Sequence, residues 1–165
     1  MIDELLGQLV IRSAEEVFET MMSLQITAEE LSGEPLFNGE IHLCATIGFA
    51  GEWNGFISLQ CSEGLAYRVT SKMLSADSTD IKKNEVWDAM GEVVNMVGGK
   101  FKAFFAEAFN SGIEAFKMSI PSVTMGKNYQ LFVVGNDTMP ETVLKTDGEL
   151  FSVKLVLKKR RHRFG

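Results

Sequence analysis

Apolar residues between Asn84 and Phe109 recur every three or four positions, which is the spacing of one face of an α-helix. This phase carries through Gly98 and Gly99, although each glycine inside a helix costs roughly 0.5–1 kcal/mol relative to alanine. We therefore predict one continuous helix over residues 84–109; the alternative is a helix that ends at Gly98, followed by a second helix. Its inward face comprises Met90, Val93, Val94, Val97, Phe101, Phe104 and Phe105.

The opposite face of this predicted helix carries a narrow stripe of different chemistry. Asp88, Glu92, Asn95 and Gly99 follow one another there at intervals of three or four residues. Two carboxylates, an amide and a position without a side chain are thus displayed together to solvent. Because the bare backbone at Gly99 would let another molecule approach Asn95 closely, this stripe is the candidate functional site.

Strand patterns precede and follow this helix. Apolar residues alternate with smaller or more polar ones over 41–49, and Gly51 with Asn54-Gly55 predicts a hairpin into a second strand at 56–61. Beyond a turn at Asn110-Ser111-Gly112 no helical period returns. Strands are predicted there over residues 114–124, 128–134, 142–145 and 149–157.

The remaining segments complete an α+β domain. Residues 2–24 have helical spacing, 31–39 form a loop, and Ser62 can cap a helix over 63–74. The central helix starts at Asp80 or at Asn84, and the pattern does not choose between them. We predict a single domain over residues 1–157, followed by a basic tail at 158–165.

Composition narrows the functional classes. The chain has 165 residues, 45% of them hydrophobic, and a net charge of −6. Removing the five positive charges of the tail leaves −11 for the body, which argues against nucleic acid as the main partner. No apolar run reaches the ~18 residues of a membrane span, and no signal peptide is recognisable. Cys44 and Cys61 fit buried free thiols, so a cytoplasmic location without a membrane is expected.

The stripe resembles the signature of the CheC/CheX/FliY phosphatases, which dephosphorylate the chemotaxis response regulator CheY. Residues 47–55 also resemble the hairpin of CheX-type members, and together the similar pieces cover residues 41–157. The interval from Asn95 to Pro121 is slightly longer than in the family pattern. The matching signature consists of Asp88-x3-Glu92-x2-Asn95, Gly99-Lys100, Ser119-Ile120-Pro121 and Gly126.

The resemblance, closest to CheX, implies two long helices packed on an antiparallel sheet and a phosphorylated CheY-like response regulator as partner. It also implies a homodimer. Glu92 would pair with the lysine of the regulator's active site, and Asp88 stands where the family has Asp or Ser. Pro121 with Ser119 either fixes the entry of a strand or is an ordinary irregular strand start. No cofactor is expected in this chain, and Mg²⁺ is expected in the partner.

An aspartyl phosphate is a reactive acyl phosphate, so its hydrolysis mainly requires a water held in line and neutralisation of charge. The amide of Asn95 can accept a hydrogen bond from that water and donate one to a phosphoryl oxygen. Asn95 and Glu92 are therefore the predicted catalytic residues. Asp88 and Gly99 are predicted to bind the partner, the first by charge and the second by leaving room for its loops.

The first helix repeats part of this spacing. Its outward side carries Glu15, Glu19 and Met22, a remnant of the same motif or a coincidence of common residues. Methionine has no polar group that could orient water, so one active site per chain is expected. The predicted apolar stripe of this helix comprises Leu6, Leu9, Val10, Val17, Phe18 and Met21.

Two functions from different classes follow. The first is a phosphatase of a CheY-like response regulator in chemotaxis or a related two-component pathway, which the pair Glu92 and Asn95 favours. The second is a non-catalytic adaptor that binds a receiver domain or resembles a flagellar-switch module. Because one fold can serve both, the decay of a phosphorylated receiver is the observation that separates them.

Overall fold

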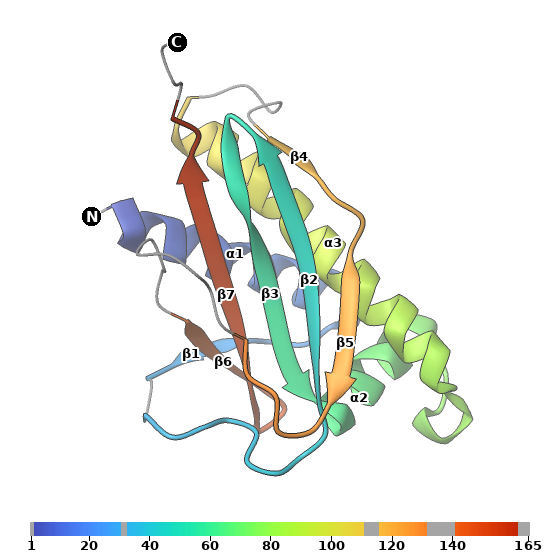
Figure 1. Ribbon diagram of the computed structural model, residues 1–165. Helices are drawn as coiled ribbons and strands as arrows, with labels where there is room; N and C mark the ends of the chain where they lie inside the picture. Colours follow the sequence, from blue (N-terminus) through green and yellow to red (C-terminus); the bar gives the residue numbers. More distant parts are fainter. Residues whose placement is uncertain (1, 31–32, 111–115, 132–140, 162–165) are drawn as a thin grey trace.

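Three α-helices and one seven-stranded sheet make up the described part of the protein (Figure 1). The computed structural model describes residues 2–30, 33–110, 116–131 and 141–161. In chain order the elements are α1 (Ile2–Met22), β1 (Thr27–Glu29), β2 (His42–Gly51), β3 (Trp53–Ser62), α2 (Glu63–Leu74), η1 (Ser78–Asp80), α3 (Lys83–Ala108), β4 (Phe116–Met118), β5 (Ser122–Gly126), β6 (Thr142–Thr146) and β7 (Glu149–Lys159). The predicted α+β fold, with helices packed on an antiparallel sheet, is confirmed.

All strand pairs of the sheet are antiparallel. The strand order is β1-β6-β7-β3-β2-β4, and β5 also pairs with β2. The two ends of β2 thus have different neighbours: Phe49 lies opposite Met118 of β4, and Thr46 lies opposite Ser122 of β5. Because β4 and β5 follow one another along β2, they form the edge of the sheet next to α3 (Figure 1).

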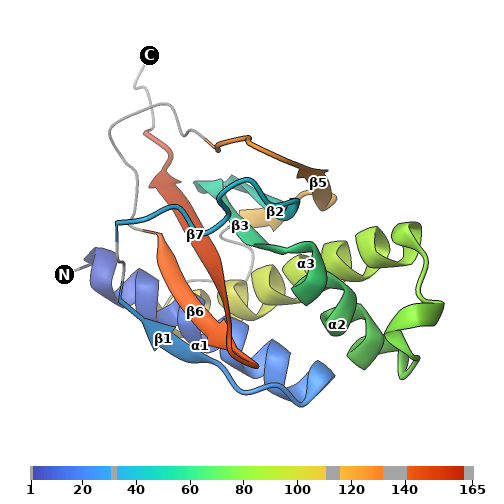
Figure 2. The same cartoon turned by 90° about the horizontal axis from the view of Figure 1, so that it is seen from below.

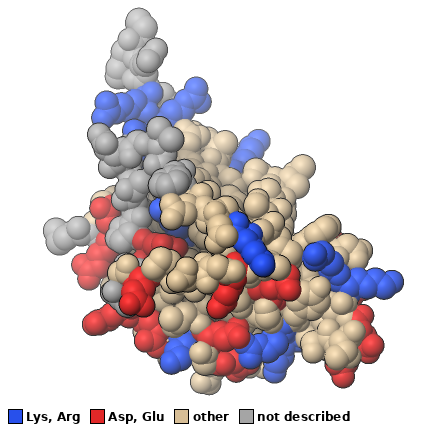
Figure 3. Space-filling view, turned by 60° about the horizontal axis from the view of Figure 1, so that its bottom comes forward, with Lys and Arg blue, Asp and Glu red and all other residues tan. Residues whose placement is uncertain are grey.

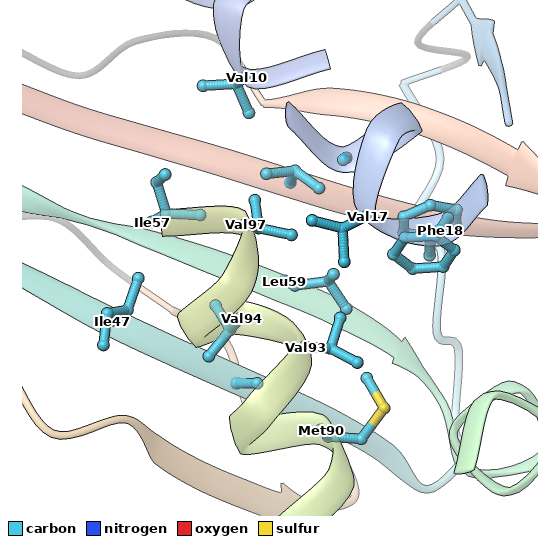
Figure 4. Close-up of a cluster of buried hydrophobic side chains, with 14 of the residues drawn as sticks. Val10, Val17, Phe18, Ile47, Ile57, Leu59, Met90, Val93, Val94 and Val97 are labelled. Carbon is cyan, nitrogen blue, oxygen red and sulfur yellow. The ribbon is translucent and has the colours of Figure 1, made fainter. Parts of the chain in front are cut away.

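The helices cover one face of this sheet (Figure 2). Figure 4 shows side chains of α3 and α1 packed together against β2 and β3, with Val93 and Val97 at the centre. Both valines are 0% exposed. An aromatic cluster continues this core toward the C-terminal end of α3, where the ring centroids of Phe101 and Phe116 lie 6.3 Å apart. The core therefore fixes the rotation of α3 about its axis.

The long central helix is continuous, as predicted. It runs from Lys83 to Ala108, and neither Gly98 nor Gly99 has a positive φ angle. Of the two starting points considered, neither is the first residue of the helix. Asp80 closes the short 3-10 helix η1, and Lys82 precedes α3 without a side-chain hydrogen bond to its N-terminus.

The end of α1 differs from the prediction. Met22 is 2% exposed, whereas Met21 is 47% exposed, so the expected orientations of these two residues are wrong. The helix ends there because Ser23 adopts a left-handed conformation with φ 53°, and the chain turns back to bury Leu24. Met22 therefore does not share the outward side with Glu15 and Glu19.

The late strands were predicted only in part. The strand expected over 114–124 is broken between β4 and β5, and residues 128–131 are not a strand. Residues 132–134 lie outside the described residues. β1 was not predicted, and β3 begins at Trp53 rather than at residue 56. β7 continues to Lys159, so the first two basic residues assigned to the tail pair within the sheet.

Two local predictions are confirmed, the N-cap of α2 and the free, buried state of both cysteines. Ser62 caps α2 by accepting a hydrogen bond of 3.1 Å from the Leu65 amide. Cys44 and Cys61 are both buried free thiols.

Among the helices of the described residues, none is long and apolar enough to cross a membrane.

Candidate active site

The outward stripe of α3 exists as predicted. Asp88 and Glu92 are exposed, and Asn95 and Gly99 are half-buried. Glu92 and Asn95 are three residues apart on a helix, which places their Cβ atoms roughly 5–6 Å from each other. Within the described parts of the chain, neither side chain makes a hydrogen bond or an ion pair. A carboxylate and an amide are therefore side by side, and both can bind an incoming molecule.

The edge formed by β4 and β5 flanks the stripe on one side. Pro121 packs on Gly91, where a Cβ atom would lie 3.7 Å from the proline Cγ. About two turns further along α3, a Cβ atom on Gly98 would lie 3.1 Å from Sδ of Met118. These two glycines let the edge of the sheet approach the helix backbone closely. The sheet edge and the stripe thus form one surface.

Hydrogen bonds hold the connection between β4 and β5 in place. The Ser119 amide donates to the carbonyl oxygen of Gly48 at 2.9 Å. The Gly48 amide in turn donates to Oγ of Ser119 at 2.8 Å. This reciprocal pair ties the signature segment 119–121 to the hairpin segment 47–55. The expectation that Ser119 and Pro121 fix a strand entry beside the helix agrees with these contacts.

Helix α1 flanks the stripe on its other side. Nζ of Lys100 lies 3.0 Å from Oε1 of Glu16, and the Arg12 guanidinium carbon lies 3.9 Å from the centroid of the Phe104 ring. Both partners of the ion pair are about half exposed, at 46% and 40% of their side chains, so the pair contributes at most about 1 kcal/mol to stability. Its structural effect is to direct Lys100 toward α1.

Figure 3 shows acidic side chains over the left and lower parts of one face of the molecule, with basic ones interspersed at its centre and lower edge, and further basic ones at its top and right. Asp88 and Glu92 add two exposed carboxylates on α3. A partner that docks on the stripe therefore needs cationic groups opposite them.

Sequence reasoning missed two contacts that shape this site. The Gly91–Pro121 contact joins residues 30 positions apart, and the Ser119–Gly48 pair spans 71 positions. The available signal was a third glycine, Gly91, inside the helical pattern, on the side that faces the sheet edge rather than on the stripe. Such a position indicates the close approach of another segment.

A cavity of about 500 Å³ lies elsewhere, on the sheet face away from α3. The His42 ring there stacks between Phe37 and Tyr129, with centroid distances of 4.8 and 3.9 Å. Gln60 also lines the cavity. None of the four predicted site residues lines it, so the chemistry expected from the sequence belongs to the stripe and not to this hollow.

Comparisons with known proteins agree on one family. The family model described as chemotaxis phosphatase CheX matches residues 43–139, which is more than half of the chain. No curated protein shows a significant match. The chain belongs to the CheX family, and the resemblance to the CheC/CheX/FliY phosphatases, closest to CheX, is confirmed.

Solved structures share the fold over nearly the whole chain. The chemotaxis protein CheX from Vibrio vulnificus has 24% identity and a TM-score of 0.75, covering 93% of this chain and 96% of that chain. CheX from Desulfovibrio desulfuricans has 25% identity and a TM-score of 0.73, with 93% and 99% covered. A CheX–CheY–BeF3–Mg²⁺ complex from Borrelia burgdorferi contains a chain with 19% identity and a TM-score of 0.70, with 92% and 97% covered.

Proposed function

We propose that this protein hydrolyses the aspartyl phosphate of a CheY-like response regulator. The observation that carries the proposal is the pair Glu92 and Asn95 on one face of α3. Glu92 is exposed and Asn95 half-buried, and neither side chain has a hydrogen-bond or ion-pair partner among the described residues. The family is described as a chemotaxis phosphatase. In the Borrelia complex a chain of the same fold is bound to CheY with BeF3, a group with the shape and charge of a phosphoryl group, and Mg²⁺.

Asn95 orients the attacking water in this mechanism. Its side-chain oxygen accepts a hydrogen bond from the water, and its side-chain nitrogen donates to a phosphoryl oxygen. The water oxygen bonds to phosphorus, the bond from phosphorus to the aspartate oxygen breaks, and the aspartate leaves as a carboxylate. The released proton passes to solvent, because an amide is too weak a base and a loose transition state does not demand prior deprotonation.

Glu92 anchors the regulator. Its carboxylate pairs with the lysine of the regulator's active site through a charge-assisted hydrogen bond, which orients the phosphoryl group toward Asn95. Asp88 extends the acidic docking surface by one helical turn. The lack of a side chain at Gly99 leaves room for the regulator's loops. The Mg²⁺ that neutralises phosphoryl charge belongs to the regulator in this proposal, and this chain supplies no cofactor.

The test is the decay of phosphorylated receiver domains in the presence of catalytic amounts of this protein. Each response regulator of the host is phosphorylated in turn, and the half-life of its aspartyl phosphate is measured with and without the protein. Multiple turnovers on one regulator support the phosphatase. Slowed or unchanged decay with every regulator contradicts it and favours the adaptor, which binds a receiver or a flagellar-switch protein without hydrolysis.

Three further expectations remain with this proposal. The protein works in the cytoplasm, where its regulator resides. It forms a homodimer, which sedimentation at micromolar concentration measures. It has one active site per chain, on α3, since Met22 of α1 is buried at 2% exposure and cannot act on an external water.

A further inference from the structure

Ile120 is the large apolar side chain that stands out on the surface of the described residues. It is 88% exposed, whereas the other exposed large hydrophobic residues are between 37% and 50% exposed. A single exposed aliphatic residue is unremarkable on its own. Here the surrounding segment is held by hydrogen bonds and adjoins the candidate active site. The exposed side chain can therefore contact a molecule that binds there.

The backbone on either side of Ile120 is fixed. Before it, Ser119 exchanges two hydrogen bonds with Gly48, and its Oγ also donates to the carbonyl of Ile120 at 3.1 Å. After it, Pro121 has a restricted φ angle and packs on Gly91. Because this backbone is already ordered, burying Ile120 against a partner costs little backbone freedom.

The position of Ile120 along α3 follows from its neighbours. Met118 lies at the level of Gly98, and Pro121 lies at the level of Gly91. Ile120 stands between them in sequence, closer to Pro121, so it lies beside the stretch of α3 between these two glycines, which includes Glu92 and Asn95. A partner that covers both this stretch of α3 and the β4–β5 edge therefore meets Asn95 and Ile120 together.

The two flanks of the stripe differ in chemistry. The α1 side presents the ion pair of Lys100 and Glu16. The β4–β5 side presents Ile120, and Trp87, 44% exposed and one turn before Gly91 on the same side of α3, extends that apolar flank. A partner with a polar rim on one side of its reacting group and an apolar patch on the other fits in one orientation.

We propose that Ile120 anchors the phosphorylated receiver domain by inserting into an apolar patch beside its phosphorylated aspartate, and that it thereby selects which receivers are accepted. This inference rests on the proposed function, because the receiver is the occupant that the acidic stripe and Asn95 require. Ile120 is a positioning residue that does not take part in the chemical step.

The test compares Ile120→Ala with Leu150→Ala, which truncates a 41% exposed leucine on β7. Steady-state dephosphorylation is measured with the preferred receiver, and binding is measured with the same receiver activated by BeF3. Because burial of one aliphatic side chain is worth about a factor of ten in affinity, Ile120→Ala should raise KM and Kd about tenfold with kcat unchanged. Leu150→Ala should leave all three constants unchanged, and neither variant should lower the melting temperature.

Two outcomes overturn the inference. Unchanged KM and Kd for Ile120→Ala, in an assay in which Asn95→Ala is inactive, would contradict the anchor while leaving the proposed function intact. A change in sedimentation coefficient of Ile120→Ala without receiver present would show that the side chain packs against a second copy instead. If the wild-type protein itself gives no turnover, binding to the BeF3-activated receiver still decides whether Ile120 is an anchor.

Discussion

Pro121 packs directly on the backbone of Gly91, and a Cβ atom at that glycine would lie 3.7 Å from the proline Cγ. This is an ordinary van der Waals distance, so Gly91→Ala should fit without displacing the β4–β5 connection. Replacing a helical glycine with alanine should then raise the free energy of unfolding by roughly 0.5–1 kcal/mol. A urea titration of the variant measures this gain.

A larger side chain at the same position serves as the matched test. Gly91→Leu should push Pro121 away from α3 and move the segment that carries Ile120 and Ser119. We expect a loss of stability of about 1–3 kcal/mol, typical of overpacking, together with a raised KM for the phosphorylated receiver. A Leu variant as stable and active as the Ala variant would show that this contact is unimportant.

The two adjacent glycines of α3 should respond in opposite directions. A Cβ atom on Gly99 would meet only Cε of Met118, at 4.0 Å, so Gly99→Ala should stabilise the protein by roughly 0.5–1 kcal/mol. A Cβ atom on Gly98 would lie 3.0 Å from Cγ2 of Ile47, which is 0% exposed and cannot readily move. Gly98→Ala should therefore lower the melting temperature, as measured by thermal denaturation.

Size at Gly99 should matter for docking rather than for folding. Gly99→Leu should leave the helix intact but obstruct the approach of a receiver to Asn95, so receiver turnover should fall while the melting temperature is kept. A destabilised Gly99→Ala, or a fully active Gly99→Leu, would each argue against this function of the bare backbone.

Glu92→Ala should weaken docking. Because hydrogen bonds to charged groups contribute about 1.5–3 kcal/mol, KM for the phosphorylated receiver and Kd for its BeF3-activated form should rise about tenfold or more. Glu107→Ala, an exposed glutamate near the end of the same helix, is the control and should behave as wild type. Intact binding with a slowed chemical step would instead assign Glu92 to the positioning of water.

Periodicity predicted α3 well because the helix is long and its inner face is buried along its whole length. The same reasoning failed at the end of α1, where Met21 and Met22 both fit the apolar phase. The choice between them depends on the turn at Ser23, which buries Leu24. A short-range pattern contains no information on that turn.

The sheet edge beside the site was less predictable for a physical reason. Whether residues 114–124 form one strand or two depends on hydrogen bonds between Ser119 and Gly48, 71 positions apart. Their alternation alone predicts an unbroken strand, which would place Ile120 in an ordinary ladder. Asp88, Glu92, Asn95 and Gly99 could be proposed as site residues from the sequence, whereas the apolar flank beside them required the fold.

Burial raises the pKa of the Cys61 thiol from 9.0 to about 12, with smaller contributions from Glu149 and Cys44. The native protein thus keeps this thiol protonated at pH values where the unfolded chain ionises it. Its contribution to stability is complete below pH 9.0 and is lost as the pH rises toward about 12. Between about pH 8.5 and 10.5, the free energy of unfolding should fall by about 1–2 kcal/mol more for wild type than for Cys61→Ala. If urea titrations show the same fall in unfolding free energy for both proteins over this pH range, the linkage is contradicted.

In the proposed mechanism hydrolysis depends on the amide of Asn95, so replacing this residue is the most direct measurement. Asn95→Ala should lower kcat for the phosphorylated receiver by about 100- to 1000-fold, the usual effect of losing one preorganised donor, with the melting temperature unchanged. Asn84→Ala removes the same group 11 residues earlier on α3, about 16 Å along the helix, and should retain full turnover. Full turnover by a folded Asn95→Ala protein would contradict the mechanism.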